Sequence, residues 1–89
     1  METADKTKET RSRFSIYQNH MARRIFKLIM EEEFEKLAVV IKSIPTKHDY
    51  EKIHYAFYFE YDASWLSLVE KFCGYDVCKE LGLYEYNFE

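Results

Sequence analysis

The sequence predicts a mostly α-helical domain, organised as a long antiparallel helical hairpin with a short C-terminal helix. Only two glycines and one proline interrupt the 89 residues, and apolar side chains recur every three or four positions over long stretches. Loop-rich β folds normally need more turn residues than this, whereas apolar residues three or four apart lie on one face of a helix. We therefore expect helices over about residues 12–44 and 47–73.

Length and composition predict one small domain that follows a polar arm. A chain this short has no room for a second hydrophobic core. Its content of 47% hydrophobic and 18% aromatic residues supplies much apolar area for a single core. The first residues, METADKTKETR, are almost entirely polar. We predict a flexible N-terminal arm over residues 1–11 and a single small helical domain over residues 12–89.

Two apolar stripes run along the first predicted helix. The first stripe consists of Phe14, Tyr17, Met21, Ile25 and Leu28. The second stripe consists of Phe26, Met30, Phe34, Leu37, Ile41 and Ile44. Because each residue advances about 100° around a helix, the two stripes lie on nearly opposite faces. They overlap in the segment IFKLIMEEEFEKL, residues 25–37, which is consequently apolar all round just before it becomes acidic.

Two structures accommodate these opposed stripes. Because Glu is a good helix former, nothing in Glu31–Glu33 breaks a helix by propensity, and we expect one continuous helix through the three glutamates. The alternative is a break or kink at Glu31–Glu33 that lets both stripes face one core.

Clear start and stop signals frame the second predicted helix. Pro45 ends the first helix because it lacks an amide hydrogen, and Thr46 with Asp49 has the spacing of a capping box. Gly74 is a natural stop, and residues 76–81 can add a last turn before Gly82. The apolar stripe between these signals consists of Tyr50, Ile53, Phe57, Tyr61, Trp65, Leu68 and Phe72.

An α+β fold is the alternative fold class. Large apolar or aromatic side chains also recur at every second position of residues 53–61, namely Ile53, Tyr55, Phe57, Phe59 and Tyr61, and Phe and Tyr favour strands. A β-hairpin of residues 37–44 and 52–61 is the form that this alternative takes. Against it, the connecting segment contains no Asn-Gly or Asp-Gly turn.

Self-association is expected from the first apolar stripe. In a helical hairpin that turns at Pro45, the second stripe packs against the second helix, so the first stripe faces away. Large apolar side chains left in water forfeit roughly 1.5–3 kcal/mol each, which favours a second surface that covers them. We predict a homo-oligomer whose interface consists of Phe14, Tyr17, Met21, Ile25 and Leu28.

Charge is unevenly distributed along the chain, whose net charge is −3. Residues 1–30 hold seven Lys or Arg against three Asp or Glu, and residues 31–89 hold six against thirteen. Such asymmetry governs how a protein meets its partners. Aromatic residues on exposed faces are typical of protein interfaces. The predicted partner-binding residues are Arg23, Arg24, Lys27, Tyr55 and Phe59.

No pattern of catalytic or metal-binding residues emerges. Cys73 and Cys78 lack the further pair that would complete four zinc ligands, and no glycine-rich phosphate loop occurs. No apolar run approaches the roughly 20 residues that span a bilayer, and the charged N-terminus lacks the apolar stretch of a secretion signal. We expect a cytoplasmic protein without membrane contact, cofactor or metal.

Two functional hypotheses follow from these observations. The first is a small intracellular protein-interaction module, a regulator or inhibitor that binds a partner protein without catalysis. The alternative is a nucleic-acid-binding protein that uses the basic N-terminal helix, with Arg11, Arg13, Arg23, Arg24 and Lys27 against phosphates.

Overall fold

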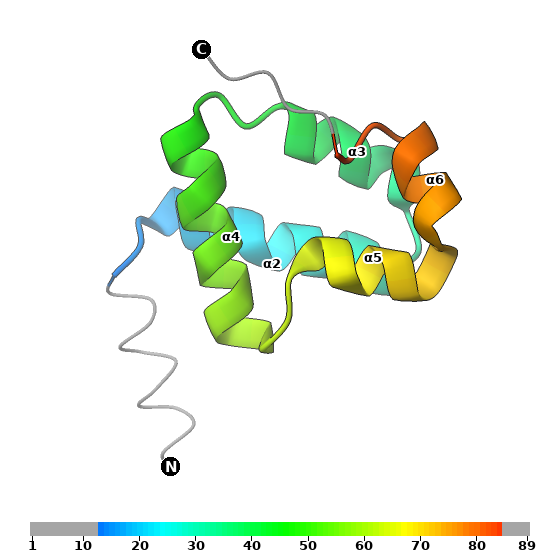
Figure 1. Cartoon of the computed structure of the whole chain (residues 1–89). Helices are drawn as coiled ribbons and strands as arrows, with labels where there is room; N and C mark the ends of the chain where they lie inside the picture. The colour runs from blue at the N-terminus through cyan, green and yellow to red at the C-terminus, as the bar shows by residue number, and fades with distance from the viewer. Residues whose placement is uncertain (1–12, 85–89) are drawn as a thin grey trace.

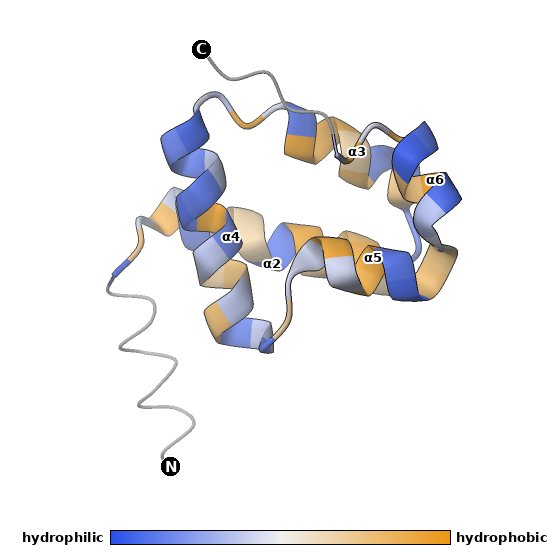
Figure 2. Cartoon of the chain, viewed as in Figure 1, coloured by the Kyte–Doolittle hydropathy of each residue, from blue (hydrophilic) through white to orange (hydrophobic). Residues whose placement is uncertain are grey.

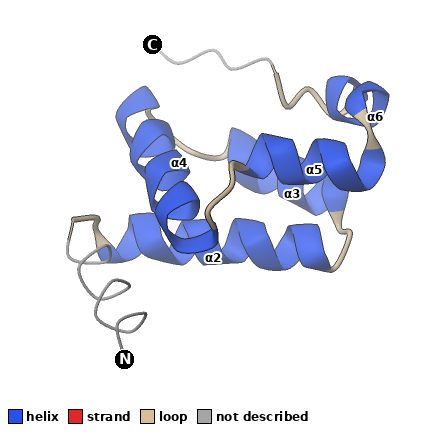
Figure 3. Ribbon diagram, turned by 60° about the horizontal axis from the view of Figure 1, so that its bottom comes forward, coloured by secondary structure: helices blue, strands red, loops and turns tan. Residues whose placement is uncertain are grey.

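Five α-helices make up residues 13–84, the part of the chain that the computed structural model describes. They are α2 (Ile16–Met30), α3 (Phe34–Lys42), α4 (Lys47–Tyr61), α5 (Trp65–Cys73) and α6 (Tyr75–Glu80) (Figure 1). The mostly α-helical fold class is thereby confirmed. The β-hairpin alternative is wrong, because its two segments lie in α3 and α4 and residues 13–84 contain no strand (Figure 3). The arm predicted for residues 1–11 lies outside the described residues.

The expected continuous helix over residues 12–44 is wrong, because α2 and α3 are separated at Glu31–Glu33. Glu32 adopts a left-handed backbone conformation with φ of 57°. The Glu32 amide donates a hydrogen bond to the Ile29 carbonyl (3.0 Å) and the Glu33 amide donates one to the Leu28 carbonyl (2.9 Å). These two bonds form a Schellman motif, which terminates a helix and satisfies its last carbonyls. The alternative of a break at Glu31–Glu33 is therefore correct.

The second predicted helix, residues 47–73, is also divided. Asp62 has a left-handed conformation with φ of 56°, and its amide donates to the Tyr58 carbonyl at 2.7 Å. Asp is among the few residues other than Gly that tolerate this conformation. Two residues later the Ser64 hydroxyl accepts from the Ser67 amide (3.1 Å) and caps α5. The single long hairpin is thus replaced by shorter helices.

Side-chain caps fix the starts of α2 and α4. Ser15 and Gln18 form a full capping box at α2. At α4 the Thr46 hydroxyl accepts from the Asp49 amide (3.1 Å), which confirms the predicted pairing of these two residues. The amide group of Gln18 also donates to the Asp49 carboxylate (3.3 Å), so the caps of the two helices are joined directly.

α2 is the central helix and contacts α3, α4 and α5. After the turn at Glu32, α3 runs back along α2, and α4 then crosses the first half of α2 (Figures 1 and 3). α6 packs on α5 at the end of the molecule near the α2–α3 turn. Apolar segments alternate with hydrophilic ones along the helices, as expected where each helix buries one face (Figure 2).

One hydrophobic core receives residues from both apolar stripes of the first predicted helix. Met21, Ile25 and Leu28 of the first stripe are buried, as are Leu37 and Ile41 of the second. The reversal at Glu32 makes this possible, because it folds the second stripe back over the first. Ala22, Ile29, Ala38, Ile44, Ile53, Ala56, Phe57, Trp65, Val69, Cys78 and Leu83 complete the buried set.

Aromatic side chains pack the junction of α2, α4 and α5. Phe26 stacks on Tyr61 with ring centroids 3.8 Å apart and an interplanar angle of 5°. Trp65 is fully buried and meets the rings of Tyr50 and Phe57 edge-on, at 5.2 and 5.9 Å. Stacked and edge-on aromatic pairs add about 0.5–1.5 kcal/mol each beyond the area that they bury. This cluster therefore holds α4 and α5 on α2.

Replacing Ile25 by Ala tests whether the first stripe belongs to the core of a single chain. Ile25 is fully buried, so Ile25→Ala is expected to lower the free energy of unfolding by about 2–5 kcal/mol. Ile16 is 90% exposed on the same helix, and Ile16→Ala is expected to change the free energy of unfolding by less than about 0.5 kcal/mol. Urea unfolding of the two variants measures both effects. Equal small effects would show that Ile25 is not a core residue.

Glycine at position 32 tests the left-handed turn. A residue other than Gly pays a steric penalty in this conformation, so Glu32→Gly is expected to raise the free energy of unfolding by about 0.5–1 kcal/mol. The neighbouring Glu31 has ordinary helical geometry with φ of −86°, so Glu31→Gly is expected to lower it by a similar amount. Thermal unfolding compares the two variants. Destabilisation by both would place residue 32 within a regular helix.

Candidate functional site

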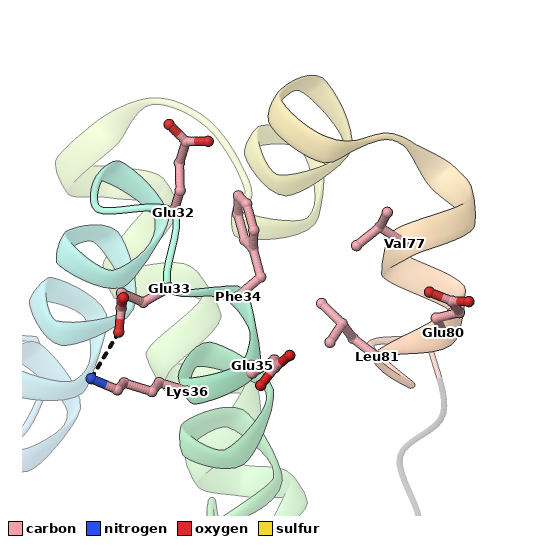
Figure 4. Close-up of a pocket in the computed structure, with 8 residues that line it drawn as sticks. All are labelled: Glu32, Glu33, Phe34, Glu35, Lys36, Val77, Glu80 and Leu81. Atoms are coloured by element: carbon pink, nitrogen blue, oxygen red, sulfur yellow. Dashed lines mark ion pairs between the residues drawn. The ribbon is translucent and has the colours of Figure 1, made fainter.

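An open groove lies between the beginning of α3 and α6, with a volume of about 410 Å³. The residues that line it are Glu32, Glu33, Phe34, Glu35, Lys36, Val77, Glu80 and Leu81 (Figure 4). Val77 and Leu81 extend from α6 toward α3, and together with Phe34 they supply the apolar part of the groove. All three side chains are partly buried, so their remaining exposed surface is available for contact.

Negative charge surrounds this apolar part. Four carboxylates line the groove, from Glu32, Glu33, Glu35 and Glu80, and Lys36 is the one basic residue among its described lining residues. The Lys36 ammonium pairs with the Glu33 carboxylate at 2.8 Å, and this hydrogen bond with Glu33 raises the pKa of Lys36. The pair neutralises one carboxylate, so the groove keeps an excess of negative charge that favours Lys and Arg side chains.

Two turns position the groove. The Schellman motif at Glu32 ends α2 and starts α3 with Phe34, which directs the acidic segment toward α6. Gly74, with φ of 87°, changes the chain direction between α5 and α6. Cys78 and Leu83 are fully buried and anchor α6 and the following turn to the core. The groove therefore lies between elements that are each fixed to the core.

The structure places the predicted self-association residues in different environments. Met21, Ile25 and Leu28 are in the core of the single chain, and Phe14 is partly buried with its ring 6.3 Å from that of Phe59. Tyr17 alone of the five is classed as exposed, at 41%. The premise that this stripe faces solvent is wrong, so the homo-oligomer prediction loses the observation on which it rested and stays a prediction.

The predicted partner-binding residues lie on α2 and α4, in more than one environment. Arg23 pairs with Glu60 of α4 (3.5 Å), which brings it close to the end of α4 where Phe59 lies. The Phe59 ring also has the guanidinium of Arg13 above it, 5.9 Å from its centroid. Arg24 lines a different hollow, beside α3. Lys27 and Tyr55 are exposed.

Cys73 and Cys78 are free thiols on either side of the bend at Gly74. Burial and the adjacent Cys78 thiol raise the pKa of Cys73 to about 11, and its Sγ donates to the Val69 carbonyl at 3.1 Å. Within residues 13–84, no three His, Cys, Asp or Glu side chains are grouped closely enough to hold a metal ion. Both cysteines therefore act as apolar packing residues at this bend.

The groove residues were not identified as a site from the sequence. In the sequence, Phe34 is part of an apolar stripe, and Val77 and Leu81 lie in the segment that is predicted only to add a last turn. The available signals were the three consecutive glutamates before Phe34 and the short amphipathic segment before Gly82. Neither signal indicates that the two segments meet.

Comparison with known proteins adds no family to this description. The sequence matches no protein-family model, and neither the curated proteins nor the solved structures include a similar chain. No described helix combines the length and apolar character needed to cross a membrane.

Thiol reactivity tests the environment of Cys73. Because only the thiolate reacts readily, a pKa near 11 keeps Cys73 mostly protonated at pH 7.5. We expect folded protein to react with a disulfide reagent more slowly than urea-unfolded protein, with a rate that keeps rising above about pH 10. Stopped-flow absorbance measures both rates. A rate that levels off by about pH 10 in the folded protein, as for a thiol of pKa about 8.5, would contradict the raised pKa of Cys73.

Proposed function

We propose that this chain is a small protein-interaction module that binds a partner protein in the α3–α6 groove and regulates it by covering the bound surface. The observation that carries the proposal is an open groove in which three apolar side chains, those of Phe34, Val77 and Leu81, lie among unbalanced negative charge. Charge complementarity then defines the partner as a segment that presents apolar side chains together with Lys or Arg. Neither catalysis nor a cofactor is part of this proposal.

The shape of the groove supports a protein segment as the occupant. An amphipathic helix laid in a groove places residues at positions i, i+3 or i+4, and i+7 on the apolar floor. Phe34 on one wall and Val77 and Leu81 on the other offer contacts to such a row. The carboxylates of Glu35 and Glu80 are exposed on the two helices that border the groove, where they are placed to meet cationic side chains beside the row.

Nucleic acid is less well supported as a ligand. Of the four cationic residues of that hypothesis within residues 13–84, Arg23 is paired with Glu60 and Arg13 lies over Phe59. Arg24 and Lys27 remain, which is few contacts for phosphate binding. Exposed aromatic residues Tyr55, Tyr58 and Phe59 on α4 lie beside Glu60 and Asp62, which also favours a protein partner over an anionic strand.

Titration with designed peptides tests the proposal. Three designed peptides of about 18 residues each form an amphipathic helix of about five turns, long enough to cover the groove. All three have the same leucine face. The polar face carries Lys in the first peptide, Gln in the second and Glu in the third. Binding is followed through backbone amide signals of isotope-labelled protein. We expect the Lys peptide to bind most tightly, to weaken with added salt, and to shift the signals of Phe34, Val77 and Leu81.

Charge reversal supplies the control. Glu35→Lys with Glu80→Lys is expected to weaken binding of the Lys peptide at least tenfold. Glu51→Lys reverses an exposed carboxylate on α4, away from the groove, and is expected to leave binding unchanged. Equal binding of all three peptides, or equal effects of the two sets of substitutions, would refute the groove as the binding site. Tighter, salt-sensitive binding of single-stranded or duplex DNA would favour the nucleic-acid alternative.

A further inference from the structure

Opposite charges lie on the two sides of α3. On one side is the acidic groove with α6. On the other side a second hollow, of about 370 Å³, is lined by Arg24 of α2 together with Glu35, Lys36, Val39 and Val40. Glu35 and Lys36 line both hollows, so α3 forms the ridge between them.

The side of α3 that faces α2 carries positive charge, chiefly from Arg24 and Lys27. Residues 13–30 contain four Lys or Arg and no Asp or Glu. Arg24, Lys27 and His20 are exposed on α2, and their spacing of three and four residues places them on one helix face. The chain therefore carries, next to its acidic groove, a surface with the charge that the groove selects.

An apolar residue lies at the middle of this arrangement. Val39 is 68% exposed on α3, and its neighbour Val40 is partly buried. Protein interfaces typically combine an apolar centre with a charged rim. On this face Val39 and Val40 form the centre, and the α2 cations and groove carboxylates form the two halves of the rim.

From these observations we infer that a second copy of this chain covers the groove, in a dimer whose twofold axis runs along α3. A twofold axis running along α3 superposes the cationic side of each copy on the acidic side of the other. Both attractive contacts then form at once, and the assembly closes at two copies. The inference rests on the proposed function, because it assigns the groove of each copy an occupant that competes with any other partner.

The dimer is consequently a regulatory device for the proposed function. When two copies cover each other's grooves, a cationic partner segment binds only after the dimer separates. Apparent partner affinity therefore falls as the concentration of the chain rises. Added salt screens the charges and weakens the dimer together with partner binding.

Reciprocal charge reversal tests the dimer. One variant carries Arg24→Glu with Lys27→Glu, and the other carries Glu32→Lys with Glu80→Lys. Sedimentation velocity is measured from micromolar to millimolar concentration at low salt. We expect wild type to dimerise, each variant alone to be monomeric with an unchanged helical circular dichroism spectrum, and an equimolar mixture of the two variants to form heterodimers. Lys47→Glu with Lys71→Glu reverses exposed charges outside both hollows and is expected to leave the dimer intact.

Three outcomes would overturn the inference: a wild type that stays monomeric at millimolar concentration, reversed variants that still dimerise alone, or a mixture that does not associate. The Arg24→Glu, Lys27→Glu variant distinguishes failure of the dimer inference from failure of the proposed function. It lacks the cationic side of the dimer contact but keeps the acidic groove that the proposed function requires. If the dimer blocks the groove, this variant binds the Lys peptide more tightly than wild type at high protein concentration. Equal binding by both contradicts the dimer alone, whereas loss of binding by both contradicts the proposed function.

Discussion

The left-handed turn at Glu32 is the constraint on which the rest of this structure depends. Its two hydrogen bonds, from the amides of Glu32 and Glu33 to the last carbonyls of α2, end that helix while satisfying groups that an abrupt end leaves unpaired. The chain then reverses, and α3 returns along α2. Two apolar stripes that a straight helix would hold on opposite faces consequently meet in one core.

The same turn creates the candidate site. Three glutamates in succession would be spread around a continuous helix, but the reversal places Glu32 and Glu33 with Phe34 at the edge of α3 that faces α6. α6 reaches this position because Gly74 redirects the chain and because Cys78 is fully buried. The acidic groove is thus a by-product of how the core closes.

The aromatic cluster between α2, α4 and α5 complements the turn. Phe26 stacks on Tyr61, the last residue of α4, and Trp65 begins α5 in contact with Phe57. The left-handed Asp62 lies between these contacts and lets α5 leave α4 in a new direction. Two residues in the left-handed conformation, neither of which is glycine, therefore divide what would otherwise be two long helices.

The sequence was sufficient for the helical class and for the helix boundaries marked by strong signals. Thr46 and Gly74 cap the helices at the predicted places, because their preferences are local and large. The break at Glu31–Glu33 is predicted only as the alternative and the break at Asp62 is not predicted, because neither Glu32 nor Asp62 is glycine. The sequence signal for the break at Asp62 is an Asp followed two residues later by Ser64, which caps the next helix. The sequence signal for the break at Glu32 is only that the two apolar stripes lie on opposite faces of a straight helix. The groove joins segments more than 40 positions apart, a pairing that no local pattern specifies.

A distance across the α2–α3 turn tests the central claim most directly. Spin labels replace His20 and Lys42, both exposed on α2 and α3, in a chain whose own cysteines are changed to alanine and which is diluted with unlabelled protein. A continuous helix would separate these positions by about 33 Å at a rise of 1.5 Å per residue. The turn at Glu32 predicts a clearly shorter distance, because adjacent helices pack with axes about 8–10 Å apart. A pulsed-resonance distance distribution centred near ~33 Å would contradict the reversal, and with it the shared core and the groove.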